Sequence, residues 1–136
     1  MTAFAYQGSQ LCCEEVPLTK IAQEVGTPCY IYSRRMLVEG YCALDQAFAG
    51  LPHLICYAMK ANANLAILRV FIDAGGGLDI VSGGELFRAL HAGADAQRIV
   101  FAGVGKSVAE IEAALRAGIL LFNVESPQEL EAIHAV

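Results

Sequence analysis

The chain has 136 residues, of which 56% are hydrophobic, with a mean hydropathy of +0.48 and a formal net charge of −5. This composition is too apolar for a disordered chain and is sufficient for one domain with a hydrophobic core. The nine Lys and Arg residues form no cluster, which argues against nucleic acid as a partner.

The N-terminus and the cysteines indicate the compartment. No run of about 18 or more apolar residues is present, and the N-terminus has neither the basic region nor the apolar core of a signal peptide. We therefore expect no membrane partner and a cytoplasmic location. The five cysteines include no Cys-x-x-Cys pair and no histidine at ligand spacing, so they are expected to be reduced thiols without a metal ion.

The first part of the chain is predicted to be a leader, residues 1–32, ahead of a main domain in residues 33–136. Within the leader, the sequence predicts a short strand at residues 4–6, a helix over 17–25 and a further short strand over 29–32. A longer helix is predicted over residues 33–49.

From residue 54 onward, apolar strand-like runs alternate with amphipathic helices. The predicted strands, at residues 54–59, 77–82, 99–102 and 119–124, begin roughly twenty residues apart, which is the length of one βα unit with short loops. Each intervening helix ends in Ala-Gly, at Gly75, Gly93 and Gly118, where glycine permits the left-handed conformation that closes a helix. Ser107 and Ser126 each begin a Ser-x-x-Glu capping box.

Buried strands that alternate with helices predict a parallel sheet in an α/β fold. The residues alone leave open a doubly wound sheet or part of a (βα)8 barrel. A complete barrel usually needs about 250 residues, and the chain ends inside a helix predicted to begin after Ser126. We therefore expect the front half of a larger structure.

Two glycine-rich stretches resemble nucleotide-binding loops but lack required glycines. Residues 103–107 (GVGKS) follow a predicted strand and open a helix, yet Val100 stands where a phosphate loop needs its first glycine. In residues 75–80, Ile80 stands where the dinucleotide-binding motif needs its last glycine. The histidines, expected at surfaces or helix ends, are His53, His91 and His134.

Lys60 and Asp79 are the two candidate site residues. Period-two alternation places Lys60 on the same strand face as Cys56 and Ala58, at the C-terminal end of the strand, where the active sites of parallel α/β folds assemble. Lys60 is then either a surface lysine that snorkels from a strand end or a Schiff-base lysine made nucleophilic by desolvation. Asp79, inside a predicted strand, is either an edge aspartate or a carboxylate that needs solvent or a cationic partner.

Four ordered motifs resemble the N-terminal part of diaminopimelate decarboxylases, which are pyridoxal-phosphate enzymes of the alanine-racemase-like barrel class. The motifs are YAMKANAN (57–64), GLDIVSGGEL (77–86), RIVFAGVGKS (98–107) and FNVES (122–126). The resemblance runs from about residue 11 to the last residue. It implies an α/β fold made of the first half, about four βα units, of a TIM-type (βα)8 barrel, truncated. Residues 1–32 would then belong partly to the family's second β-domain, and residues 33–136 to the partial barrel.

The resemblance also implies the site residues, the cofactor and the partners. Lys60 is expected to carry pyridoxal 5'-phosphate as a Schiff base, and Asp79, in a D-x-x-S-x-x-E pattern with Ser82 and Glu85, is expected near the cofactor. The substrate would be a small amino acid, meso-2,6-diaminopimelate, decarboxylated to L-lysine and CO2 by a homodimer. The family's residues for the cofactor phosphate and ring lie beyond Val136, so this chain alone is expected to be inactive.

Two other functions remain open at this point. One is a related decarboxylase acting on ornithine, arginine or a carboxylated polyamine, because the specificity residues lie mostly outside this chain. The SGGEL and GVGK segments are more similar to the diaminopimelate branch. The other is a non-catalytic binding or regulatory protein of the same fold.

Overall fold

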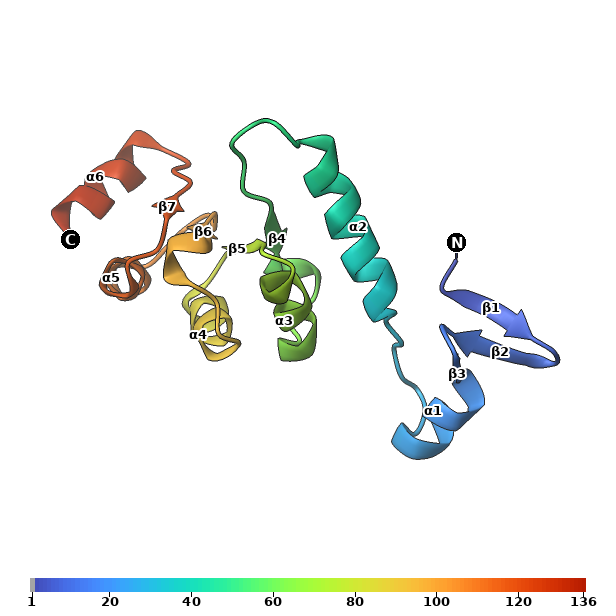
Figure 1. Ribbon diagram of the computed structural model, residues 1–136. Coiled ribbons are helices and arrows are strands. Elements are labelled where there is room, and N and C mark those ends of the chain that lie inside the picture. Colours follow the sequence, from blue (N-terminus) through green and yellow to red (C-terminus); the bar gives the residue numbers. More distant parts are fainter. Residues whose placement is uncertain (1) are drawn as a thin grey trace. The chain divides into compact units, whose positions relative to one another are not determined.

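The computed structural model describes residues 2–136, which divide into two compact units (Figure 1). The first unit extends to Gln46 and the second covers Ala47–Val136. The predicted domain boundary after residue 32 concerns the family's domains rather than these units, and it stays a prediction.

The first unit contains a three-stranded antiparallel sheet and two helices. Its strands are β1 (Phe4–Gln7), β2 (Gln10–Cys13) and β3 (Val16–Pro17), followed by helices α1 (Leu18–Val25) and α2 (Arg34–Ala47). The predicted strand at 4–6 and both helices are present. The prediction of a strand over residues 29–32 is wrong, because no strand of the described chain pairs with this segment and Tyr30 is 92% exposed.

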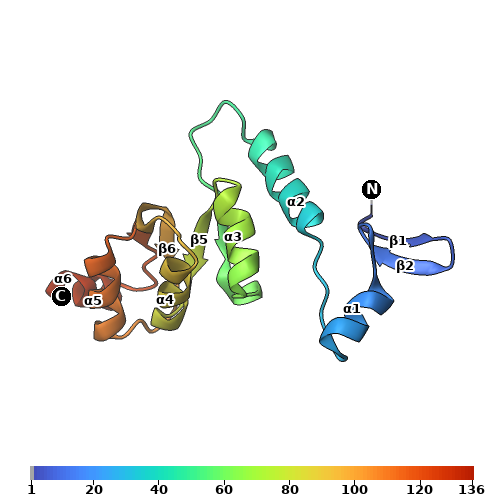
Figure 2. The same ribbon diagram turned by 60° about the horizontal axis from the view of Figure 1, so that its bottom comes forward.

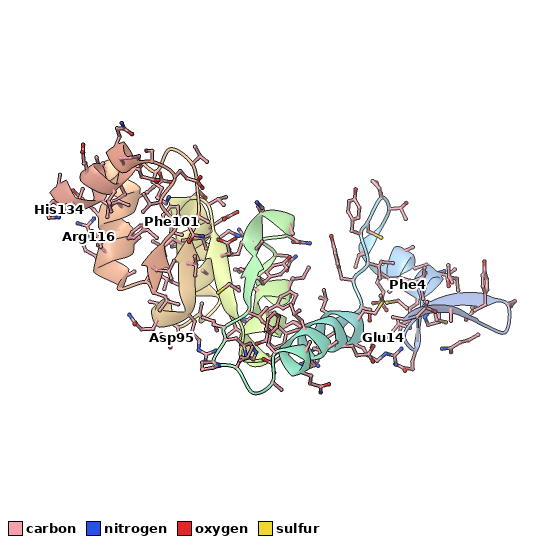
Figure 3. All side chains as sticks on the ribbon, turned by 90° about the horizontal axis from the view of Figure 1, so that it is seen from above. Phe4, Glu14, Asp95, Phe101, Arg116 and His134 are labelled. Carbon is pink, nitrogen blue, oxygen red and sulfur yellow. The ribbon has the colours of Figure 1, made fainter. Side chains whose placement is uncertain are left out.

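The start of helix α2 is capped by Ser33 and by Glu14, which follows strand β2. The Ser33 hydroxyl accepts the N–H of Met36 at 3.0 Å and donates to Glu14 Oε1 at 2.6 Å. The same Glu14 oxygen accepts the N–H of Arg35 at 2.9 Å. The Glu14 side chain is labelled in Figure 3. These bonds satisfy N–H groups that a helix start leaves without partners, and they lower the pKa of the Glu14 carboxyl.

The second unit is a repeat of parallel strands and helices, as predicted. Its strands pair in the order β4-β5-β6-β7, all parallel. Figure 2 shows the alternation of helix and strand through α3, β5, α4, β6 and α5. The strands are β4 (Cys56–Ala58), β5 (Gly77–Ile80), β6 (Ile99–Phe101) and β7 (Leu121–Phe122). The helices are α3 (Leu65–Asp73), α4 (Gly83–His91), α5 (Val108–Ala117) and α6 (Pro127–Ala135), with 3-10 turns η1 (Met59–Ala61) and η2 (Ala96–Arg98).

The strand order favours the barrel over the doubly wound sheet. Helices α3, α4 and α5 lie along one side of the strands (Figure 1), and the strand order follows the chain without reversal. A doubly wound sheet reverses its strand order and carries helices on both faces, whereas a (βα)8 barrel keeps one direction and one helical layer. The unit therefore has the winding of four successive βα units of a barrel.

The core of the second unit lies between the sheet and its helices. It contains Leu78 and Ile80 of β5, Ile99 and Phe101 of β6, and Met59 after β4, each 0% exposed. The helix ends follow the prediction, with positive φ values of 90°, 91° and 70° at Gly75, Gly93 and Gly118.

The two predicted capping boxes have different outcomes. At Ser107 the box is complete, since its hydroxyl accepts the N–H of Glu110 and the Glu110 carboxylate accepts the N–H of Ser107. At Ser126 only the hydroxyl bond, from the N–H of Glu129, is present. Glu129 instead accepts the N–H of Glu125 and a lysine ammonium, so the second half of that prediction is wrong.

Candidate functional site

Lys60 lies at the carboxyl edge of the parallel sheet, but not in a strand. Strand β4 ends at Ala58, and the chain enters the turn η1, which buries Met59 completely and leaves Lys60 exposed. The prediction that the strand continues through Met59 to Lys60 is therefore wrong, because β4 ends at Ala58 and the chain forms a 3-10 turn, which does not keep the period of two. The prediction that Lys60 lies at the C-terminal end of its strand is nevertheless correct.

Asp79, in the neighbouring strand β5, lies near Lys60. It pairs in register with Ala58, two residues before Lys60. Its Oδ1 atom is buried and has no hydrogen-bond partner in the described chain. Burial raises the pKa of the Asp79 carboxyl, and the positive charge of Lys60 opposes that rise. The structure thus brings the two predicted site residues together, and Lys60 is the cationic neighbour that Asp79 needs.

Ser82 and Glu85, from the same sequence pattern, act on the backbone at the start of α4. The Ser82 hydroxyl accepts the N–H of Glu85 at 3.2 Å, and Glu85 Oε2 accepts the N–H of Val81 at 2.7 Å. These bonds fix the turn that leads from β5 into α4. The two residues therefore hold the loop beside Asp79 in place.

Lys106 links two loops at the same edge, a role that sequence reasoning missed. Its side chain is 0% exposed, and its Nζ donates to the carbonyls of Gly103 at 2.7 Å and Asn123 at 2.8 Å and to Glu129 Oε1 at 2.6 Å. It also lies 5.6 Å from the centroid of the Phe101 ring. The lysine of GVGKS is thus held by three oxygens of its own protein and joins the loops after β6 and β7.

Glu110 makes the corresponding link one unit earlier. Its Oε1 accepts the N–H of Gly83 at 2.7 Å, and its Oε2 accepts the N–H and the hydroxyl of Ser107. The bond from Gly83, followed by those from Ser107, lowers the pKa of the Glu110 carboxyl. The loops after β5 and β6 are therefore held together by an ionised carboxylate.

This carboxylate predicts a pH-dependent stability. Because the folded-state pKa is lowered, its stabilisation is present above the ordinary value of 4.5 and is lost as the pH falls through the folded pKa. We expect Glu110→Gln to lower the free energy of unfolding at pH 7 by about 1 kcal/mol, and this difference between variant and native protein to shrink as the pH falls below 4.5. Urea unfolding at several pH values measures this. Glu112→Gln, which removes the partner of an exposed Arg116 within α5, is the control; an equal gap at every pH would contradict the assignment.

The histidines do not join the site. The His53 ring nitrogen Nδ1 lies 2.8 Å from the carbonyl of Leu51, and the His91 ring stacks on Phe87 along α4. His134 is in the last turn of α6. Within residues 2–136, no group of three metal-ligating side chains is close enough to hold an ion, and all five cysteines are free. No helix of this range is both long and apolar enough to cross a membrane.

Comparison with known proteins decides the family. Residues 34–136 match the sequence model of a protein family, the pyridoxal-binding domain of pyridoxal-dependent decarboxylases. The chain belongs to this family.

Individual relatives of the chain are diaminopimelate decarboxylases. The chain is 52% identical over 126 residues to the enzyme of Neisseria meningitidis, covering 93% of the chain and 30% of the relative. It is 48% identical to that of Pseudomonas aeruginosa, covering 100% of the chain and 33% of the relative. The chain thus spans about a third of the length of the curated relatives it matches.

Solved structures of such enzymes have the same fold. The diaminopimelate decarboxylase of M. jannaschii, in a complex with L-lysine, superposes with a TM-score of 0.92 at 33% identity, covering 99% of the chain and 33% of that structure. The Helicobacter pylori enzyme, also complexed with L-lysine, gives a TM-score of 0.83 at 46% identity, with coverages of 87% and 30%. These matches confirm the predicted α/β class and the partial barrel.

Lys60 and Asp79 fit the cofactor of a pyridoxal-dependent family. An exposed amine can reach an aldehyde, and the buried Oδ1 of Asp79 lacks the donor that a buried carboxylate oxygen requires. Both residues lie at the carboxyl edge of the sheet, where ligands of such folds bind.

Proposed function

We propose that this chain is the part of a diaminopimelate decarboxylase that attaches pyridoxal phosphate, and that Lys60 is the attaching residue. The observation that carries the proposal is the position of Lys60 at the carboxyl edge, where its charge acts on Asp79 and the buried Oδ1 of Asp79 has no hydrogen-bond partner in the described chain. The chain's family depends on pyridoxal, so an amine at this edge has a defined use.

The surroundings of the three lysines favour Lys60 over the other two. Lys20 lies on the surface of α1, 65% exposed, beside Glu24. Lys106 is buried and donates to three oxygens, so attaching a cofactor to it would leave a carboxylate and two carbonyls without their donor. Lys60 is exposed at the sheet edge next to a carboxylate.

Each of the two residues then has a distinct task. Lys60 would hold the cofactor through its amine, on a flexible stem that would let the amine move away from the cofactor and return. Asp79 lies near the Lys60 amine and would offer its Oδ1 atom to a donor on the bound molecule. When bound, the cofactor supplies the electron sink that stabilises the carbanion left by the departure of CO2.

The substrate we propose is meso-2,6-diaminopimelate, with L-lysine and CO2 as products. Support comes from the names of the curated relatives and from the L-lysine in two related structures. The relatives are about three times as long, so we also propose that residues 1–136 alone do not decarboxylate. A homodimer in the cytoplasm is the assembly and location we expect of the whole enzyme.

Decarboxylation by the intact protein loaded with pyridoxal phosphate tests this function. We expect CO2 release from meso-diaminopimelate with L-lysine as product, and release from ornithine or arginine at least about 100-fold slower, since the buried polar groups of a specific site reject analogues that leave them unpaired. Faster release from ornithine or arginine would indicate the related decarboxylase instead. Cofactor binding without release from any of the three amino acids would indicate a non-catalytic relative.

A further inference from the structure

The loop that follows Lys60 is held by hydrogen bonds at both ends of one peptide group. This group joins Ala63 to Asn64 and connects η1 to α3. Its carbonyl, on Ala63, accepts from Arg88 Nε at 2.9 Å and from Arg88 Nη2 at 2.7 Å. Its N–H, on Asn64, donates to Asn62 Oδ1 at 2.9 Å. The orientation of this peptide is therefore fixed from both sides.

The residues on either side of this peptide are fixed as well. The Tyr57 hydroxyl donates to the carbonyl of Asn62 at 3.3 Å, and the Asn64 side chain accepts the N–H of Ala66 in the first turn of α3. On the other side of Lys60, Met59 is 0% exposed in the core. The backbone of Lys60 thus lies between a buried side chain and a bonded loop, while its own side chain is exposed.

We infer that Arg88 is a positioning residue for Lys60: its guanidinium holds the loop that sets where the Lys60 amine lies. Arg88 comes from α4, one βα unit later in the chain, so its two bonds tie the loop after β4 to a different helix. Nothing in the proposed chemistry requires Arg88 to touch the cofactor. The inference rests on the proposed attachment at Lys60 and adds to it the residue that orients the amine.

Arginine suits this task better than lysine. Its planar guanidinium presents two N–H donors to one carbonyl, and hydrogen bonds from a charged donor are short and strong. A lysine at position 88 would offer one rotating ammonium in place of this fixed fork. We therefore expect Arg88→Lys to restore only part of the effect.

The reaction step that depends on this geometry is the attachment itself. The neutral Lys60 amine adds to the aldehyde carbon of pyridoxal phosphate, and a carbon–nitrogen double bond forms as one water leaves with the aldehyde oxygen and both amine protons. The rate of this step depends on how often the amine lies at attack distance. Initial binding of pyridoxal phosphate through its other groups does not depend on Arg88.

The test measures attachment of pyridoxal phosphate to the intact apoprotein over a range of cofactor concentrations, with borohydride trapping at each time point. For Arg88→Met we expect the first-order rate constant of attachment at saturating cofactor to fall about tenfold. The cofactor concentration that gives half of this rate should stay within about twofold of the native value. Arg88→Lys should be intermediate. Arg69→Met, which removes an exposed arginine from α3, is the matched control and should attach at the native rate. All rates are taken at a temperature where each variant is folded.

A second variant covers a folding failure of Arg88→Met. Asn62→Ala releases the N–H end of the same peptide without touching the guanidinium, and it should also lower the first-order rate constant at saturating cofactor. Native attachment rates in both Arg88→Lys and Asn62→Ala, or in Arg88→Met itself, would overturn the positioning role. Unchanged labelling of a Lys60→Ala variant would overturn the proposed function instead, so the two failures are distinguishable.

Discussion

Lys60→Ala in the intact protein is expected to lower kcat for decarboxylation by at least about 1,000-fold, because the variant has lost the amine that attaches the cofactor and later displaces the product from it. The fold should be retained, since the Lys60 side chain is exposed and the core contact of this turn is made by Met59. Steady-state CO2 release, with circular dichroism to verify folding, measures the effect.

The other lysine at the protein surface provides the control. Lys20 is exposed on α1 and paired with Glu24 on the same helix, so Lys20→Ala should leave kcat unchanged. A folded Lys60→Ala variant within tenfold of the native kcat would contradict the proposed role. Added ethylamine, which supplies a free amine where the Lys60 amine was, should restore part of the lost rate.

Lys106→Met is expected to have the largest effect on stability, lowering the free energy of unfolding by about 3 kcal/mol. The change would leave the Glu129 carboxylate and the carbonyls of Gly103 and Asn123 without their shared donor, while the methionine retains most of the apolar stem. Urea unfolding of the intact protein at pH 7 measures the difference.

Two further variants separate the effect of losing the buried Lys106 ammonium from the general effect of losing a lysine. Lys20→Met removes an exposed lysine and should change the free energy of unfolding by no more than about 0.5 kcal/mol. Glu129→Gln keeps an oxygen acceptor for Lys106 but removes the charge, so it should cost less than Lys106→Met. A loss below about 1 kcal/mol for Lys106→Met would show that the three bonds to Nζ contribute little.

Local sequence patterns were sufficient for most elements of the second unit. Its strands are short apolar runs, and helices α3, α4 and α5 end at Ala-Gly, so the residues that signal each element are close together in the sequence. The same patterns brought Lys60 and Asp79 to one edge, because in a parallel sheet the ends of successive strands meet there. The turn at Lys60 was not predicted, because the apolar run continues through Met59 in the sequence whereas the strand ends at Ala58 and Met59 begins η1.

The interactions that hold the site together could not be predicted because their partners are far apart in sequence. Arg88 is separated from Ala63 by 25 residues and Lys106 from Glu129 by 23, and no short motif encodes either pair. Glu110 and Glu129 occupy positions typical of a capping box, which explains their helix starts but not their bonds to the preceding loop. Strands β2 and β3 were missed for a related reason, since each is defined only by its pairing with a neighbour.

The most direct test is to identify the residue to which pyridoxal phosphate attaches. The intact protein is incubated with pyridoxal phosphate, reduced with borohydride, digested, and its peptides are sequenced by mass spectrometry. We expect the pyridoxyl group on Lys60, inside the segment Tyr57–Asn64, and no stoichiometric label in the Lys60→Ala variant. A label on Lys106 or Lys20, or equal labelling of Lys60→Ala, would contradict the account.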